Sequence, residues 1–82
     1  MKVQARFFAL YRERVGQSTV DFDLAEGATV ADLVASVMQA YPGLSPDPAK
    51  LVVAVNREYA EHTEPLRDGD EAAFIPPVSG GV

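Results

Sequence analysis

The stretch that decides the fold runs from Thr29 to Gly43 and reads TVADLVASVMQAYPG. Its apolar residues recur at the i, i+3, i+4, i+7 spacing of one helix face: Val30, Leu33, Val34, Val37, Met38 and Tyr41. Thr29 is placed to cap this helix, Asp32 stands at the N3 position of a capping box, and Pro42-Gly43 ends it. A helix with one apolar face buries it against a sheet, so the stripe predicts core rather than a cofactor site.

Two segments before this helix alternate with the period of a β-strand, at residues 2–8 and 17–24. Between them, residues 9–15 are expected to form a short helical turn closed by Gly16. Phe8 breaks the pattern, because it falls on the polar side of its strand. A large aromatic residue there is either covered by a loop or part of an exposed apolar patch, and such patches often mark docking surfaces.

The segments after the helix predict a hairpin. Residues 44–50 contain two prolines and are expected to form a loop. The β-branched run at residues 51–55 predicts a strand in the middle of the sheet, buried on both faces. Asn56-Arg57 is the expected turn, and residues 58–60 are the short return strand.

A last strand is predicted at residues 71–75, after the turn signal Asp68-Gly69-Asp70. Ala72 and Phe74 share one face of it, and Ile75 lies on the other. The order is then two strands, one long helix and two or three strands. This order predicts an α+β fold of the β-grasp (ubiquitin-like) type, a roll in which one main helix packs across a mixed sheet of about four to five strands.

The segment after the last strand reads PPVSGGV. Pro76-Pro77 stop any strand ladder, because each ring fixes φ and removes a backbone donor. Glycine has no β-carbon, so Gly80-Gly81 can lie extended in a channel too narrow for side chains. We therefore expect a domain at residues 1–76 and a flexible tail at 77–82, which reaches roughly 17 Å from Pro77 to Gly81. The alternative is an ordinary frayed terminus.

Composition excludes several classes of function. The chain has 82 residues and no cysteine, so it is one domain without disulfides, thiolate metal sites or a cysteine nucleophile. Any thioester or persulfide chemistry must use the sulfur of a partner. A net charge of -5 argues against nucleic acid and favours partners with a basic docking surface. His62 stands alone, so no metal site is expected. No signal peptide or long apolar run is present, which predicts a cytoplasmic protein without membrane contact.

Three groups of residues carry a resemblance to a known family. They are Phe7-Phe8-Ala9 followed by Arg12-Glu13 and Val15-Gly16, then Ala54-Val55-Asn56, and the string from Pro65 to Gly81, PLRDGDEAAFIPPVSGG. In this combination, the chain resembles the MoaD and ThiS group of ubiquitin-like sulfur carriers, to which the small subunits of molybdopterin synthase belong. The resemblance covers the chain from its first strand to Gly81, and the last string is its most specific part.

The resemblance implies that the chain is not an enzyme but a sulfur donor in molybdenum cofactor biosynthesis. In the family, a ubiquitin-activating-like enzyme uses ATP and Mg to adenylate the terminal glycine, which is then converted to a thiocarboxylate. The tail enters the large subunit of molybdopterin synthase, where the active site lies and the sulfur is donated. The chain itself is expected to bind no cofactor.

On this chain, the resemblance assigns the activated carboxylate to Gly81. It assigns contact with the larger partner to Phe8, Tyr59 and Ile75 and to the tail residues Pro76, Pro77, Val78, Ser79 and Gly80. Strand alternation also sends Phe8, Tyr59 and Ile75 outward, and anchors of this kind dominate the binding energy of interfaces. For each of these three, burial under a loop is the open alternative.

Val82 departs from the family pattern, which ends in a free Gly-Gly. One hypothesis is that a peptidase removes Val82 and leaves Gly81 ready for activation. Another is that the chain has lost sulfur transfer and serves only as a binding module. Two more alternatives remain open: a related carrier for thiamine, cysteine or tRNA thiolation, or a ubiquitin-like modifier joined through Gly81 to lysines. The Pro-Pro before the tail disfavours the thiamine carriers.

Overall fold

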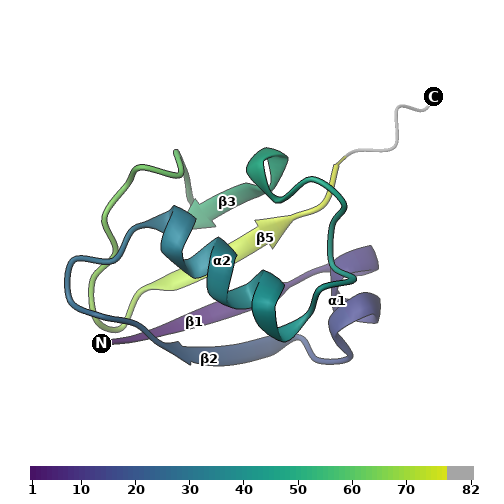
Figure 1. Ribbon diagram of the computed structural model, residues 1–82, viewed down its shortest axis with the longest axis horizontal. Coiled ribbons are helices and arrows are strands. Elements are labelled where there is room, and N and C mark those ends of the chain that lie inside the picture. The colour runs from purple at the N-terminus through teal and green to yellow at the C-terminus, as the bar shows by residue number, and fades with distance from the viewer. Residues whose placement is uncertain (78–82) are drawn as a thin grey trace.

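The computed structural model describes residues 1–77. Its elements are β1 (Lys2–Phe7), α1 (Ala9–Val15), β2 (Thr19–Asp23), α2 (Val30–Ala40), the 3-10 turn η1 (Pro48–Lys50), β3 (Val52–Val55), β4 (Glu58–Ala60) and β5 (Glu71–Ile75). The strands form one sheet in the order β2-β1-β5-β3-β4, in which only β1 and β5 run parallel. α2 crosses one face of this sheet (Figure 1). The predicted mixed sheet with one main helix is confirmed.

α2 begins and ends where the sequence predicts. The Asp32 backbone N–H donates to the Thr29 hydroxyl at 3.4 Å, and the Thr29 N–H donates to the Asp32 carboxylate at 2.8 Å, which completes the capping box. Tyr41 ends the helix, with its N–H donating to the Val37 carbonyl. A cap of this kind stabilises a helix by about 1 kcal/mol. The buried side chains of α2 are those of the predicted stripe, Val30, Leu33, Val34 and Val37.

The core lies between α2 and the sheet. Phe7 of β1 and Phe74 of β5 are fully buried there, and their rings stack with centroids 5.3 Å apart. Tyr41 meets Phe7 edge-on at 6.3 Å. Leu44 and Leu66 are also buried, although both lie in loops. Leu44 and Leu66 thus add to the core from loops. The periodicity of strands and helices does not predict the burial of such loop residues.

The prediction for residues 51–55 needs correction. Val53 and Ala54 are buried on opposite faces of β3, as expected, but Val52 is 46% exposed. It pairs with Ile75 on the face away from α2, where no helix of residues 1–77 covers the sheet. β3 does lie inside the sheet, paired with β5 on one side and with β4 on the other, and β5 is the third of the five strands. In addition, η1 gives the predicted loop before β3 a short helical turn.

The turn between β3 and β4 has positive φ at both central residues, 49° at Asn56 and 73° at Arg57. This is the pattern of a type I′ turn, whose twist matches that of the strands it joins. The Asn56 side chain donates to the Asp70 carboxylate at 3.0 Å and accepts from the Glu71 N–H at 3.1 Å. The turn is therefore tied to the start of β5, and its two-residue length places Ala54 opposite Tyr59.

Candidate functional site

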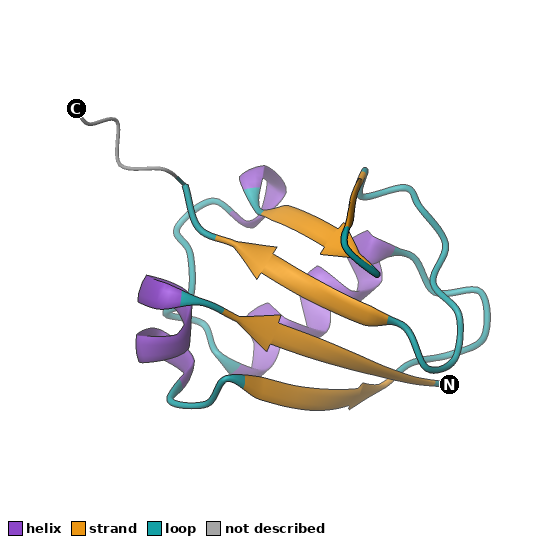
Figure 2. Cartoon of the chain, turned by 180° about the vertical axis from the view of Figure 1, so that it is seen from behind, coloured by secondary structure: helices purple, strands orange, loops and turns teal. Residues whose placement is uncertain are grey.

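The face of the sheet away from α2 is turned toward the viewer in Figure 2 and is here called the open face. It carries the three predicted docking residues. Phe8, Tyr59 and Ile75 come from separate parts of the chain, yet they line one depression of about 460 Å³. We call this depression the apolar hollow. Its lining consists of Arg6, Phe8, Ala54, Arg57, Tyr59, Glu71, Ala73 and Ile75.

Strand register explains why the open face is hollow at this place. Arg6 lies opposite Ala73 on β5, and Ala73 lies opposite Ala54 on β3. Ala54 in turn lies opposite Tyr59 on β4. The two alanines in the middle of this row are too short to fill the space between the long side chains at its ends. They form a low floor between Arg6 and Tyr59.

Phe8 lies at one end of the hollow, at the junction of β1 and α1. β1 ends at Phe7, and Phe8 is the N-cap of α1 with an extended backbone, φ −120° and ψ 153°. Its side chain is 39% exposed, as predicted. The Arg6 guanidinium lies 5.6 Å from the centre of the Phe8 ring and pairs with the Glu71 carboxylate at 3.1 Å. Cation–π contact and the ion pair thus hold Arg6 beside Phe8.

The other two docking residues differ in exposure. Tyr59 is 78% exposed on the short strand β4, while Ile75 is partly buried at the end of β5. Val52, the partner of Ile75 in the ladder, and Leu10 of α1 are further exposed apolar residues that the sequence did not single out. Apolar side chains that gather on an exposed face, as Phe8, Tyr59 and Ile75 do around the hollow, are typical of a site that another protein covers.

The predicted tail begins beside the apolar hollow. Pro76 is partly buried and Pro77 is exposed, directly after Ile75. Both prolines lie beyond the last ladder pair of β5, as expected from their missing N–H groups. Val78, Ser79, Gly80, Gly81 and Val82 lie outside the described residues, so their predicted roles and the boundary at residues 76 and 77 stay predictions.

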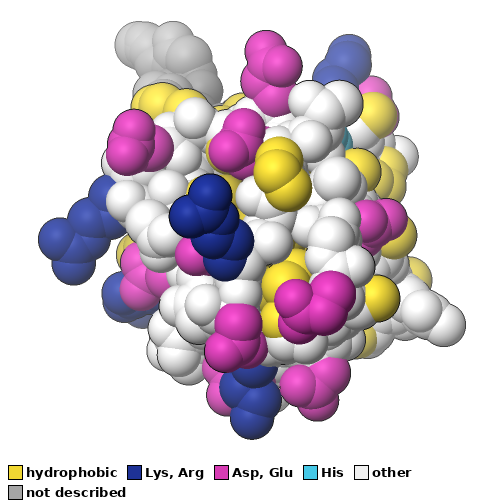
Figure 3. Space-filling view, turned by 90° about the vertical axis from the view of Figure 1, so that its left-hand side faces the viewer, with side chains coloured by type: hydrophobic (Ala, Val, Ile, Leu, Met, Phe, Trp, Pro, Cys, Tyr) yellow, Lys and Arg dark blue, Asp and Glu magenta, His cyan; other side chains and the backbone are white. Residues whose placement is uncertain are grey.

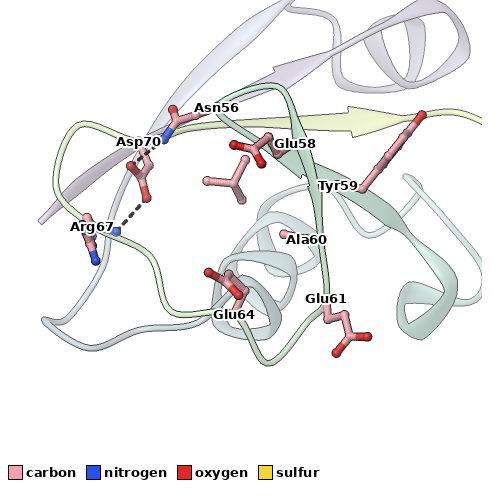
Figure 4. A pocket seen from close by; sticks show the side chains of 9 residues that line it. Asn56, Glu58, Tyr59, Ala60, Glu61, Glu64, Arg67 and Asp70 are labelled. Carbon is pink, nitrogen blue, oxygen red and sulfur yellow. Dashed lines mark hydrogen bonds between the residues drawn. The ribbon is translucent and has the colours of Figure 1, made fainter.

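A second hollow of about 550 Å³ lies on the other side of Tyr59 (Figure 4). We call it the acidic hollow, because it is lined by four carboxylates, those of Glu58, Glu61, Glu64 and Asp70, with Arg67 beside them. Acidic side chains are spread over the end of the molecule seen in Figure 3. This distribution agrees with the net charge of -5.

Residues 1–77 contain neither a cluster of potential metal ligands nor a helix of membrane-spanning length. No group of three or more His, Asp or Glu side chains in that range is placed to hold a metal ion. His62 instead lies with its Nε2 atom 2.7 Å from the Leu51 carbonyl, which ties the loop after β4 to the start of β3. No helix in the described part of the chain is long and apolar enough to cross a membrane.

Sequence reasoning missed five residues of the apolar hollow: Arg6, Ala54, Arg57, Glu71 and Ala73. One signal could have found Ala54, because a two-residue turn at Asn56-Arg57 fixes it opposite Tyr59. Arg6 and Ala73 depend on the parallel pairing of β1 with β5, which joins segments about as far apart as the chain allows. Alternation within one strand does not reveal such a pairing.

Comparison with known proteins gives consistent matches over the full chain. A molybdopterin synthase sulfur carrier subunit from Chlamydomonas reinhardtii is 41% identical over 99% of this chain and 100% of its own length. The small archaeal modifier protein SAMP1 from Haloferax volcanii superposes with a TM-score of 0.87 at 34% identity, covering 99% of this chain and 100% of SAMP1.

A third match is a subunit in a complex. A chain in the complex of subunits 1 and 2 of the molybdopterin-converting factor from Helicobacter pylori has a TM-score of 0.69 at 26% identity, covering 99% of this chain and 100% of its own. These structures confirm the predicted β-grasp fold. The model of the ThiS family matches residues 5–81, which include the tail up to Gly81. The chain is therefore a member of the ThiS family.

Proposed function

We propose that this chain is the sulfur carrier subunit of a molybdopterin synthase and donates sulfur from a thiocarboxylate at Gly81. The full-length similarity to the Chlamydomonas sulfur carrier subunit is the observation that carries the proposal. The chain acts as a donor rather than as an enzyme, and the active site belongs to its larger partner. A cytoplasmic location is part of the same proposal.

The chemistry requires little of this chain beyond its terminal carboxylate. A carboxylate is a poor electrophile until one of its oxygens can depart as part of AMP. The adenylating partner, a ubiquitin-activating-like enzyme, supplies ATP and Mg for that step. A partner's sulfur then displaces AMP, because this chain contains no cysteine. Val82 follows Gly81, so the proposal includes its prior removal by a peptidase.

The apolar hollow supports a role in docking the large subunit. Phe8, Tyr59 and Ile75 surround it, and Pro76 and Pro77 lead directly away from it. A partner that covers the hollow therefore holds the start of the tail at a fixed place. Positioning of this kind is how a chain without catalytic groups contributes to a reaction rate.

A second candidate is a ubiquitin-like modifier joined through Gly81 to lysines. The TM-score of 0.87 with a small archaeal modifier protein favours it. A carrier for another thiolation pathway uses the same activated glycine, so it differs in its partner rather than in its own chemistry. A binding module with an inert tail is the remaining alternative.

The test is to incubate residues 1–81 with the adenylating enzyme, ATP, Mg and a sulfide source, followed by mass spectrometry of the intact chain. We expect the mass increase of one oxygen-to-sulfur exchange in residues 1–81. The full-length chain and a chain ending at Gly80 are the controls, and both should stay unchanged.

Each alternative gives a different result. Transfer to lysines would support the modifier. Failure of activation in residues 1–81, together with large-subunit binding that survives deletion of residues 80–82, would support the binding module. Activation of the full-length chain would contradict the need for a peptidase.

A further inference from the structure

The turn between β3 and β4 holds an arginine in a backbone conformation that favours glycine. Arg57 has a φ of 73°, and Asn56 before it has a φ of 49°. In a turn of this type, asparagine is a common first residue and glycine is the usual second one. A β-carbon at the second position is unfavourable, and glycine would relieve it. Strain at an observed outlier points to a side chain retained for function.

The surroundings of Arg57 agree with that interpretation. Its side chain lines the apolar hollow. Within the described part of the chain, its guanidinium enters none of the ion pairs and none of the side-chain hydrogen bonds. Arg6, the other arginine of the hollow, is neutralised by Glu71 at 3.1 Å. The hollow therefore has one uncompensated positive charge at its rim.

The charge of Arg57 stands out against the rest of the molecule. The chain carries a net charge of -5, and the hollow on the other side of Tyr59 is lined by the carboxylates of Glu58, Glu61, Glu64 and Asp70. A partner that met this acidic side would need basic groups. A partner that fills the apolar hollow instead meets the positive charge of Arg57. Its complementary surface is an apolar side chain with a carboxylate next to it.

We propose that Arg57 is a specificity-determining residue of the docking surface, which pairs with a carboxylate that the partner protein presents next to the apolar side chain filling the hollow. The inference rests on the proposed function, in which the partner is the large subunit of molybdopterin synthase. Arginine suits this place because its planar guanidinium can bind a carboxylate through two hydrogen bonds.

The experiment compares Arg57→Gln with Arg67→Gln in binding to the purified large subunit from the same genome. Both variants lose one positive charge from an exposed arginine, but Arg67 lines the acidic hollow instead. We expect Arg57→Gln to bind at least about threefold more weakly at low salt, with the difference shrinking as salt screens the pair. Arg67→Gln should bind as the unaltered chain does.

A third variant, Arg57→Gly, tests the strain. We expect its urea midpoint to be equal to or higher than that of the unaltered chain, while its binding weakens as in Arg57→Gln. If all three variants bound the large subunit with the affinity and salt dependence of the unaltered chain, the inference would be overturned and the proposed function would stand. A lower urea midpoint in Arg57→Gly than in the unaltered chain would have the same consequence. Failure of the unaltered chain to bind the large subunit would instead overturn the proposed function, and the inference with it.

Discussion

The two faces of the sheet place neighbouring residues in opposite surroundings. Phe7 and Phe74 are 1% and 0% exposed and stack against each other beneath α2. The next residues along the chain, Phe8 and Ile75, lie on the open face around the apolar hollow. Successive side chains of a strand point to opposite faces of the sheet, so one segment contributes residues to both faces. The covered face therefore determines stability, while the open face is left for recognition.

The largest effect is expected on the covered face, for Phe74→Ala. Truncating a buried phenylalanine typically costs about 3–5 kcal/mol, because a cavity adds to the lost burial. That loss approaches the whole free energy of unfolding of a small domain, roughly 5–15 kcal/mol. Urea unfolding followed by circular dichroism measures it. Ile75→Ala is the control from the adjacent residue, and an equal loss in both variants would contradict the separation of the faces.

Ala72 and Ala73 of β5 compare the two faces of the sheet at adjacent positions, and we expect effects of intermediate size on the free energy of unfolding. Ala72 is fully buried beneath α2, so Ala72→Leu should cost about 1–3 kcal/mol through overpacking. Ala73 lies at the bottom of the apolar hollow, where a larger side chain has space. Ala73→Leu should therefore change the free energy of unfolding by only about 0.5 kcal/mol. The same Ala73 variant should block binding to the large subunit by filling the hollow. Retained binding by Ala73→Leu would exclude the hollow from the interface.

The smallest effect on stability is expected for Tyr59→Ala. With 78% of Tyr59 exposed, the free energy of unfolding should stay within about 0.5 kcal/mol of the unaltered chain. Binding to the large subunit should weaken by about 2 kcal/mol, as for an aromatic hot spot. Titration calorimetry measures the affinity, with Glu61→Ala in the acidic hollow as the control. A marked loss of stability would show that Tyr59 supports the fold.

Sequence patterns predicted the local features of the fold well. α2 follows from its apolar stripe and from the capping box of Thr29 and Asp32. The turns at Asn56-Arg57 and at Asp68-Gly69-Asp70 follow from Asn56 and Gly69, which accept positive φ, and Gly69 has a φ of 86°. These features depend on residues within a few positions of one another, so the information lies in the local sequence.

Features that depend on distant pairing were predicted less well. The apolar run at residues 51–55 correctly predicted a strand inside the sheet, but not that Val52 would be exposed or which strands would flank it. The apolar hollow was predicted only through its outward residues, Phe8, Tyr59 and Ile75. Its alanine floor arises from the row in which β1, β5, β3 and β4 lie side by side. That row exists only once the chain has folded.

The position of β5 has a consequence for how the protein is made. β5 is the last strand along the described chain, yet it lies third of five in the sheet. Without it, β2-β1 and β3-β4 are two separate hairpins with no shared ladder. Ribosomes release the amino-terminal part of a chain first, so the sheet closes only after Glu71–Ile75 has emerged. A nascent chain stopped before that point lacks the strand that joins the two hairpins, so its apolar residues stay exposed until synthesis is almost complete.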